Sequence, residues 1–105
     1  MQQRTIQVHV LVSGSVHDVG FRASVSRQAQ ALKLRGWVRN LPDGRVEGVF
    51  HGLQHSVESM VRWCQRGPLR AAVSDVAVTR QGLEAFEGFA VKADPPAPPQ
   101  EGIDA

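Results

Sequence analysis

Apolar residues recur at every second position near the start of the chain, which predicts a half-buried strand. These residues are Ile6, Val8, Val10 and Val12, and the residues between and after them are Gln7, His9, Leu11 and Ser13. From Phe21 the spacing becomes helical, because the next apolar positions are Val25, Ala29 and Leu32. This part of the chain therefore predicts a strand followed by a helix, and Gly36 is expected to end that helix.

The second half of the chain predicts a hairpin, another helix and two more strands. Short strands at 37–41 and 45–51 are joined by Pro42-Asp43-Gly44, a composition typical of a hairpin turn. A second apolar stripe at helical spacing consists of Val57, Met60, Val61 and Cys64. Ser56 is the expected N-cap of this helix, Gly67-Pro68 is its expected end, and strands at 73–79 and 86–92 follow.

This order of elements predicts the fold class. Two strand-helix-strand units in succession match the α+β ferredoxin-like arrangement β-α-β-β-α-β, in which two helices cover one face of a mainly antiparallel sheet. A short terminal strand completes it. The layout alone does not fix a function, because unrelated activities share it.

Composition and length favour one globular domain. The chain has 105 residues, of which 42% are hydrophobic, and it contains one cysteine. No apolar run approaches the roughly 20 residues of a membrane span, and the N-terminus lacks the features of a signal peptide, so a cytoplasmic protein is expected. The domain is predicted at 1–93, and the proline-rich segment 94–105 is expected to be a disordered tail.

Charge is unevenly distributed and favours anionic ligands. The net charge is +2, but residues 1–93 carry 12 basic and 7 acidic groups, a local surplus of +5. The segment between the first strand and the first helix offers backbone N–H groups at the positive end of a helix dipole, which suits an anion such as phosphate. Arg22 is the first cation after that segment, and its guanidinium could bind the same anion.

Two motifs in the chain resemble the signatures of the acylphosphatase family. The first runs from Gly14 to Arg22 and is similar to the family pattern Gly-x-Val-x-x-Val-Gly-Phe-Arg. The second combines Gly36-Trp37-Val38-Arg39-Asn40 with Gly44-Arg45-Val46 and Gly52, at the family's spacing. The resemblance covers about 5–92 and leaves the proline-rich segment outside.

The resemblance implies hydrolysis of the carboxyl-phosphate bond of small acyl phosphates, without a metal or organic cofactor. It assigns Arg22 to the phosphoryl oxygens and Asn40 to the attacking water. It assigns the rest of the phosphate cradle to backbone N–H groups of one loop: Ser15, Val16, His17, Asp18, Val19, Gly20 and Phe21. Inorganic phosphate or sulfate is the expected ligand of this loop, and a monomer without membrane or nucleic-acid partners is expected.

The loop departs from the family pattern at His17-Asp18, where Gln-Gly is usual. A carboxylate about 6 Å from one phosphate charge would repel it by roughly 3 kcal/mol at an effective dielectric of 20. If Asp18 faces the anion, it is expected to weaken phosphate binding. The alternative interpretation is that Asp18 points outward or caps the following helix, where its charge would favour the helix dipole. His17 is expected to be an exposed imidazole.

Other functions and sites remain open at this point. A catalytically weak anion-binding module and a basic nucleic-acid-binding domain are the alternatives, although the central strands offer only Phe50 for base stacking. His51 and His55 have the spacing of a helical metal pair, but Gly52 interrupts it. Cys64 is expected to be a packed core thiol, and neither Ser13 nor Ser15 has a partner that would activate it.

Overall fold

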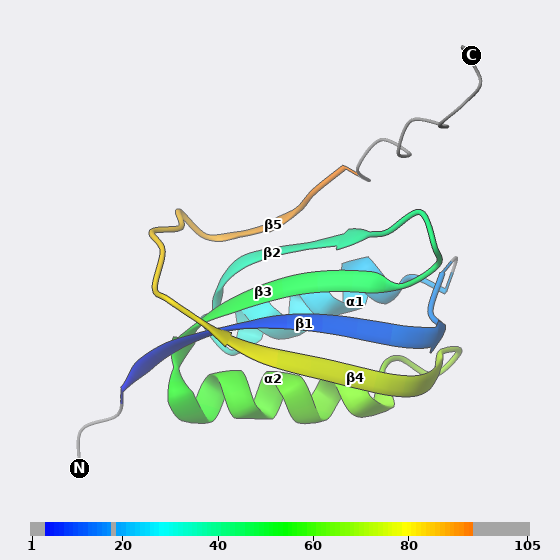
Figure 1. The fold of residues 1–105 in the computed structure, drawn as a ribbon, viewed down its shortest axis with the longest axis horizontal. Helices are drawn as coiled ribbons and strands as arrows, with labels where there is room; N and C mark the ends of the chain where they lie inside the picture. Colours follow the sequence, from blue (N-terminus) through cyan, green and yellow to red (C-terminus); the bar gives the residue numbers. More distant parts are fainter. Residues whose placement is uncertain (1–3, 18, 94–105) are drawn as a thin grey trace, which may run out of the picture.

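The computed structural model describes residues 4–17 and 19–93 and has an α+β ferredoxin-like fold. Its elements are β1 (Thr5–Ser15), α1 (Phe21–Ala31), β2 (Arg35–Asn40), β3 (Val46–Leu53), α2 (Gln54–Arg66), β4 (Ala72–Gln81) and β5 (Phe89–Val91). One five-stranded sheet has the order β4-β1-β3-β2-β5. Both helices lie on the same face of this sheet (Figure 1). The predicted fold class is confirmed.

The core lies between the sheet and the helices, and β1 supplies its centre. The alternating residues predicted to be apolar in β1 are all buried, namely Ile6, Val8, Val10 and Val12. β1 pairs antiparallel with both β3 and β4, so its buried face continues across three strands. α2 adds Val57, Met60 and Cys64 from the stripe seen in the sequence. Burial raises the pKa of the Cys64 thiol to about 12, so the thiol is protonated at neutral pH, as a core cysteine should be.

β5 is short, but it adds a parallel strand to the sheet beside β2. Val91 pairs with Val38, and the backbone N–H of Lys92 donates to the carbonyl of Val38 at 2.8 Å. Phe89 stacks on Phe50 with 5.7 Å between ring centroids. Because Phe50 faces the helices and is 1% exposed, it offers no surface for stacking a base.

The end of α1 differs from the sequence prediction. The helix ends at Ala31 rather than at Gly36, because the chain turns at Lys33, which has φ 59°, and the Leu34 N–H donates back to the Ala29 carbonyl at 2.9 Å. Gly36 lies inside β2. A Cβ atom there would lie 2.0 Å from the Val49 carbonyl oxygen, so the glycine permits close strand packing instead of ending a helix.

The start of α2 also differs from the prediction, because Ser56 is not its N-cap. β3 passes directly into α2, and Leu53 occupies the N-cap position without a side-chain hydrogen bond. The N–H of Gln54 donates instead to the carbonyl of Arg4 at 2.9 Å, which satisfies one donor of the first turn. Ser56 lies within the helix and is buried.

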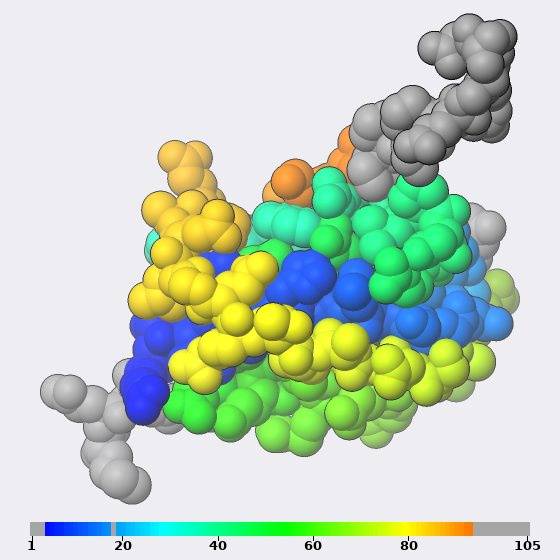
Figure 2. Space-filling view, viewed as in Figure 1, coloured from blue at the N-terminus to red at the C-terminus, as the bar shows by residue number. Residues whose placement is uncertain are grey.

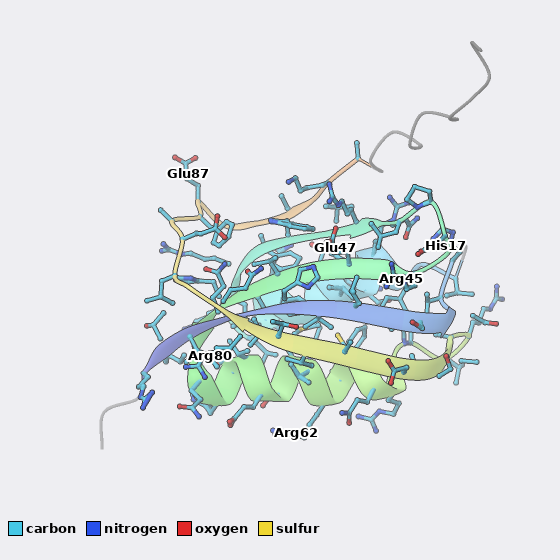
Figure 3. The ribbon with its side chains drawn as sticks, viewed as in Figure 1. His17, Arg45, Glu47, Arg62, Arg80 and Glu87 are labelled. Atoms are coloured by element: carbon cyan, nitrogen blue, oxygen red, sulfur yellow. The ribbon has the colours of Figure 1, made fainter. Side chains whose placement is uncertain are left out.

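The other face of the sheet carries polar side chains that are linked to one another. The Glu47 carboxylate lies 2.6 Å from Nε of Arg39 and 2.7 Å from Nε2 of His9. Figure 3 shows Glu47 on this face. Partial burial raises the pKa of Glu47, but the hydrogen bonds from His9 and Arg39 outweigh it and hold that pKa below its usual range. Trp37 lies beside this cluster, with the cations of Arg39 and Lys92 at 5.0 and 4.5 Å from its ring centroid.

The segment between β4 and β5 crosses one end of this face and is fixed there by Gln7. The side chain of Gln7 is fully buried, although it is polar. Its Nε2 donates to Gln81 and Glu84, and its Oε1 accepts the backbone N–H of Glu84 at 2.8 Å. Figure 2 shows the yellow segment after β4 lying against the blue atoms of β1. This contact determines where the chain enters β5.

Candidate active site

The connection between β1 and α1 is the short segment in which the sequence predicted a phosphate cradle. Ser15 is the last residue of β1 and Phe21 the first of α1, so the loop itself covers 16–20. The N–H of Val16 donates to the carbonyl of Gly14 at 3.0 Å, and the Val16 side chain is buried in the core. Within the same loop, Asp18 lies outside the described residues. The chain thus turns sharply as it leaves the sheet and enters the helix.

Gly20 begins α1 in a conformation that favours glycine. It is the N-cap of α1, with φ 71° and ψ 23°, which is left-handed backbone. The N–H of Ser24 donates to the carbonyl of Gly20 at 3.0 Å and closes the first helical turn. The N–H groups in the first turn of an α-helix lie at the positive end of the helix dipole. Since Gly20 is the N-cap, Asp18 precedes the cap position by two residues.

Arg22 and Asn40 come together in one cavity. The cavity has a volume of about 270 Å³ and is lined by Val16, Gly20, Phe21, Arg22, Ala23, Asn40 and Val91. Arg22 lies in the first turn of α1, and Asn40 is the last residue of β2. Among these lining residues Arg22 alone is charged, so the cavity combines one cation, one neutral amide and the N-terminus of a helix. These described residues form a set that can bind an anion.

Asn40 reaches the cavity because of the pleat of β2 and the turn that follows. Val38 is buried on the helix side of the sheet, and Asn40, two residues later, points to the same side. Beyond it the N–H of Leu41 donates to the carbonyl of Arg45 at 2.8 Å, which starts the turn into β3. The side chain of Asp43 accepts the N–H of Arg45 at 3.1 Å within the turn, and this hydrogen bond lowers the pKa of the Asp43 carboxyl. The turn thereby fixes the end of β2.

A family model with the description acylphosphatase matches residues 8–91 of the chain. The chain belongs to the acylphosphatase family. An acylphosphatase from Trichormus variabilis is 56% identical over 91 residues, which cover 87% of this chain and 90% of that protein. Among solved structures, an acylphosphatase from Coxiella burnetii has a TM-score of 0.83 and 39% identity, covering 88% of this chain and 99% of that one. A crystal structure of the Bacillus subtilis acylphosphatase has a TM-score of 0.81 and 36% identity, covering 83% of this chain and 98% of that one.

His17 is not the exposed imidazole that the sequence suggested. The residue is half-buried, and its Nε2 atom is buried without a hydrogen-bond partner. In this acylphosphatase loop Val16 is buried in the core and Val19 packs against the core. The segment that carries His17 therefore lies close to the core. Figure 3 shows His17 at the same end of the sheet as Arg45. Sequence alone could not show this, because burial in a loop leaves no periodic pattern.

The other candidate residues lie away from this cavity. His51 is in β3, with Nδ1 3.3 Å from Oε1 of Gln7, whereas His55 is in α2. Within residues 4–17 and 19–93, no group of three or more His, Cys, Asp or Glu side chains could hold a metal ion. In the same described part of the chain, no helix is long and apolar enough to cross a membrane.

Sequence reasoning missed two lining residues, Ala23 and Val91. Ala23 directly follows Arg22, the last residue of the first motif, and this adjacency was a usable signal. Val91 reaches the cavity because β5 pairs with β2 in parallel. This pairing sets Val91 opposite Val38, two residues before Asn40. No local pattern in the sequence indicates which strand β5 joins, so Val91 left no such signal.

Proposed function

We propose that this protein is an acylphosphatase that hydrolyses small acyl phosphates to a carboxylate and inorganic phosphate, without a metal or organic cofactor. The observation that carries the proposal is the shared cavity of Arg22 and Asn40 beside the N-cap glycine of α1. Membership of the acylphosphatase family over residues 8–91 supports it. Two residues 18 positions apart in the sequence thus line one cavity.

The proposed mechanism relies on position and charge. In an acyl phosphate the leaving group is a carboxylate, which departs easily, so a covalent nucleophile is unnecessary. Arg22 and the loop N–H groups would bind the phosphoryl oxygens and stabilise the charge that builds up in the transition state. The Asn40 amide would accept a hydrogen bond from the attacking water and hold it near phosphorus. Being uncharged, it does not repel the phosphate.

The test is turnover of acetyl phosphate by the full chain in the presence of a metal chelator. The native protein should release phosphate at the same rate with and without the chelator. Arg22→Ala should lower kcat/KM by at least about 100-fold, as loss of one oxyanion-type donor does, and Asn40→Ala should lower kcat by a similar factor. Circular dichroism should show that both variants remain folded.

A matched control separates this role from the general effect of an arginine on the helix. Arg27 is an exposed arginine of the same helix and donates a hydrogen bond to Ser24. Arg27→Ala should leave turnover unchanged. Phosphate binding without turnover in the native protein would instead identify an anion-binding module, and salt-sensitive RNA binding that is unaffected by Arg22→Ala would indicate a nucleic-acid-binding domain.

The proposal includes a monomer in the cytoplasm. Among the described residues the exposed large apolar side chains come from different strands and connecting segments: Leu53, Leu69, Val78, Leu83 and Val91. The one cysteine of the chain is a buried free thiol, which agrees with a reducing compartment. Light scattering of the protein as it elutes from a size-exclusion column should give the mass of one chain.

A further inference from the structure

The cavity is lined by polar groups that suit phosphate and by apolar side chains that do not bind it. The polar groups come from Arg22, Asn40 and the N-cap glycine. The remaining lining residues are Val16, Phe21, Ala23 and Val91. Val16 and Phe21 are only 1% and 2% exposed, so they belong to the core and form the base of the cavity. Ala23 is exposed and Val91 is 48% exposed, so these two side chains border the opening.

We propose that Val91 and Ala23 form an acyl subsite, which makes this enzyme prefer acyl phosphates whose acyl group is uncharged and apolar. The inference rests on the acylphosphatase function proposed above and names the substrate class. When the phosphoryl group is held at Arg22, the acyl group must extend toward the rest of the lining. The two side chains that border the opening there are apolar and come from different elements, α1 and β5.

The charges around the cavity argue in the same direction. Arg22 is the one charged lining residue within the described part of the chain, and the phosphoryl group engages it. Lys92 follows Val91 directly, but its ammonium lies 4.5 Å from the Trp37 ring centroid on the other face of the sheet. Arg39 is held on that face by Glu47. A second carboxylate on the acyl group would therefore lose hydration beside Val91 without gaining a cation.

The test compares two rigid substrates that differ by one charge, benzoyl phosphate and 4-carboxybenzoyl phosphate. The native protein should have a kcat/KM about tenfold higher for benzoyl phosphate than for 4-carboxybenzoyl phosphate, because the second carboxylate would lie unpaired beside apolar side chains. Val91→Lys should shift this ratio by about fivefold to tenfold in favour of 4-carboxybenzoyl phosphate. Val91→Ala should lower kcat/KM for benzoyl phosphate about threefold to tenfold, with a smaller loss for acetyl phosphate.

Val78 provides a matched control. It is 45% exposed, close to the value for Val91, but it lies on β4, at the opposite edge of the sheet (Figure 1). Val78→Lys adds the same charge to the protein and should leave the substrate ratio unchanged. Equal shifts in Val78→Lys and Val91→Lys would overturn the subsite, because a general charge effect would then explain both.

Failure of this inference can be told apart from failure of the proposed function. If turnover depends on Arg22 but the ratio in Val91→Lys stays within threefold of the native value, the acyl subsite is wrong and the function stands. If the native protein hydrolyses none of the three acyl phosphates, the function is wrong and the subsite falls with it.

Discussion

Gly20 shows how one residue shapes the cavity through its backbone. It is the N-cap of α1 and has left-handed φ and ψ. Arg22, two residues after the N-cap, therefore lies in the first helical turn. Any residue with a Cβ atom is strained in this conformation, although the space around Gly20 would admit one. The position therefore depends on conformational freedom rather than on lack of room. Two positions earlier in the sequence stands Asp18, where the family pattern has glycine.

Removing the charge of Asp18 should strengthen phosphate binding. A carboxylate about 6 Å from the phosphate costs roughly 3 kcal/mol at an effective dielectric of 20, so Asp18→Asn should lower the inhibition constant of inorganic phosphate by up to about 100-fold. Asp18→Gly should do so at least as well, because it also frees the backbone. The measurement is competitive inhibition of acetyl phosphate turnover.

Asp75 offers the control for this prediction. It is exposed on β4, away from the cavity, and Asp75→Asn changes the net charge by the same amount. This variant should leave the inhibition constant nearly unchanged. Inhibition and turnover that stay the same in both Asp18 variants would show that Asp18 does not act on the phosphate.

β5 is the element whose position depends most on other parts of the molecule. It has three residues, Phe89–Val91, whereas the sequence predicted a strand at 86–92, and it pairs with β2 after a connection that crosses the sheet. That connection is fixed by hydrogen bonds of the buried Gln7 side chain with Gln81 and Glu84. Val91 lies in β5, the strand that follows this connection.

Gln7→Leu should loosen this connection while keeping a side chain of similar size. The substitution leaves the backbone N–H of Glu84 without its acceptor, so the free energy of unfolding should fall by about 1–3 kcal/mol in urea titrations. Amide hydrogen exchange should accelerate at 82–88 more than in β1 or β3.

An exposed glutamine provides the comparison. Gln65→Leu, at an exposed position of α2, should change the free energy of unfolding by less than about 0.5 kcal/mol. A stability loss in Gln7→Leu with no faster exchange at 82–88 would mean that Gln7 supports the sheet but does not hold the connection.

For the whole molecule, we propose that residues 1–93 are the folded unit. The family model ends at residue 91, which is also the last residue of β5. The predicted tail 94–105 lies outside the described residues. A protein ending at Ala93 should keep its free energy of unfolding within about 0.5 kcal/mol and should retain its kcat for acetyl phosphate. A clear loss of either would show that the last twelve residues contribute to the fold or to the site.

The sequence by itself determined the elements and the family. Period-two alternation in β1 and the apolar stripe of α2 depend only on which face of each element is buried, and both are confirmed. The two motifs likewise indicated the acylphosphatase family, since their residue types and spacing are read directly from the chain. Helix ends were less well predicted: Gly36 and Ser56 were given roles that backbone pairing overrides.

Only the tertiary structure decided how distant residues combine. It brought Arg22 and Asn40 to one cavity, placed Val91 at its opening, and buried Gln7 and the Nε2 atom of His17. Each of these features depends on contacts between segments far apart in the chain or on the packing of a loop. Neither kind of contact produces a periodic pattern of apolar residues in the sequence. A strand pattern reports which side chains face inward, but it does not report which strand lies alongside.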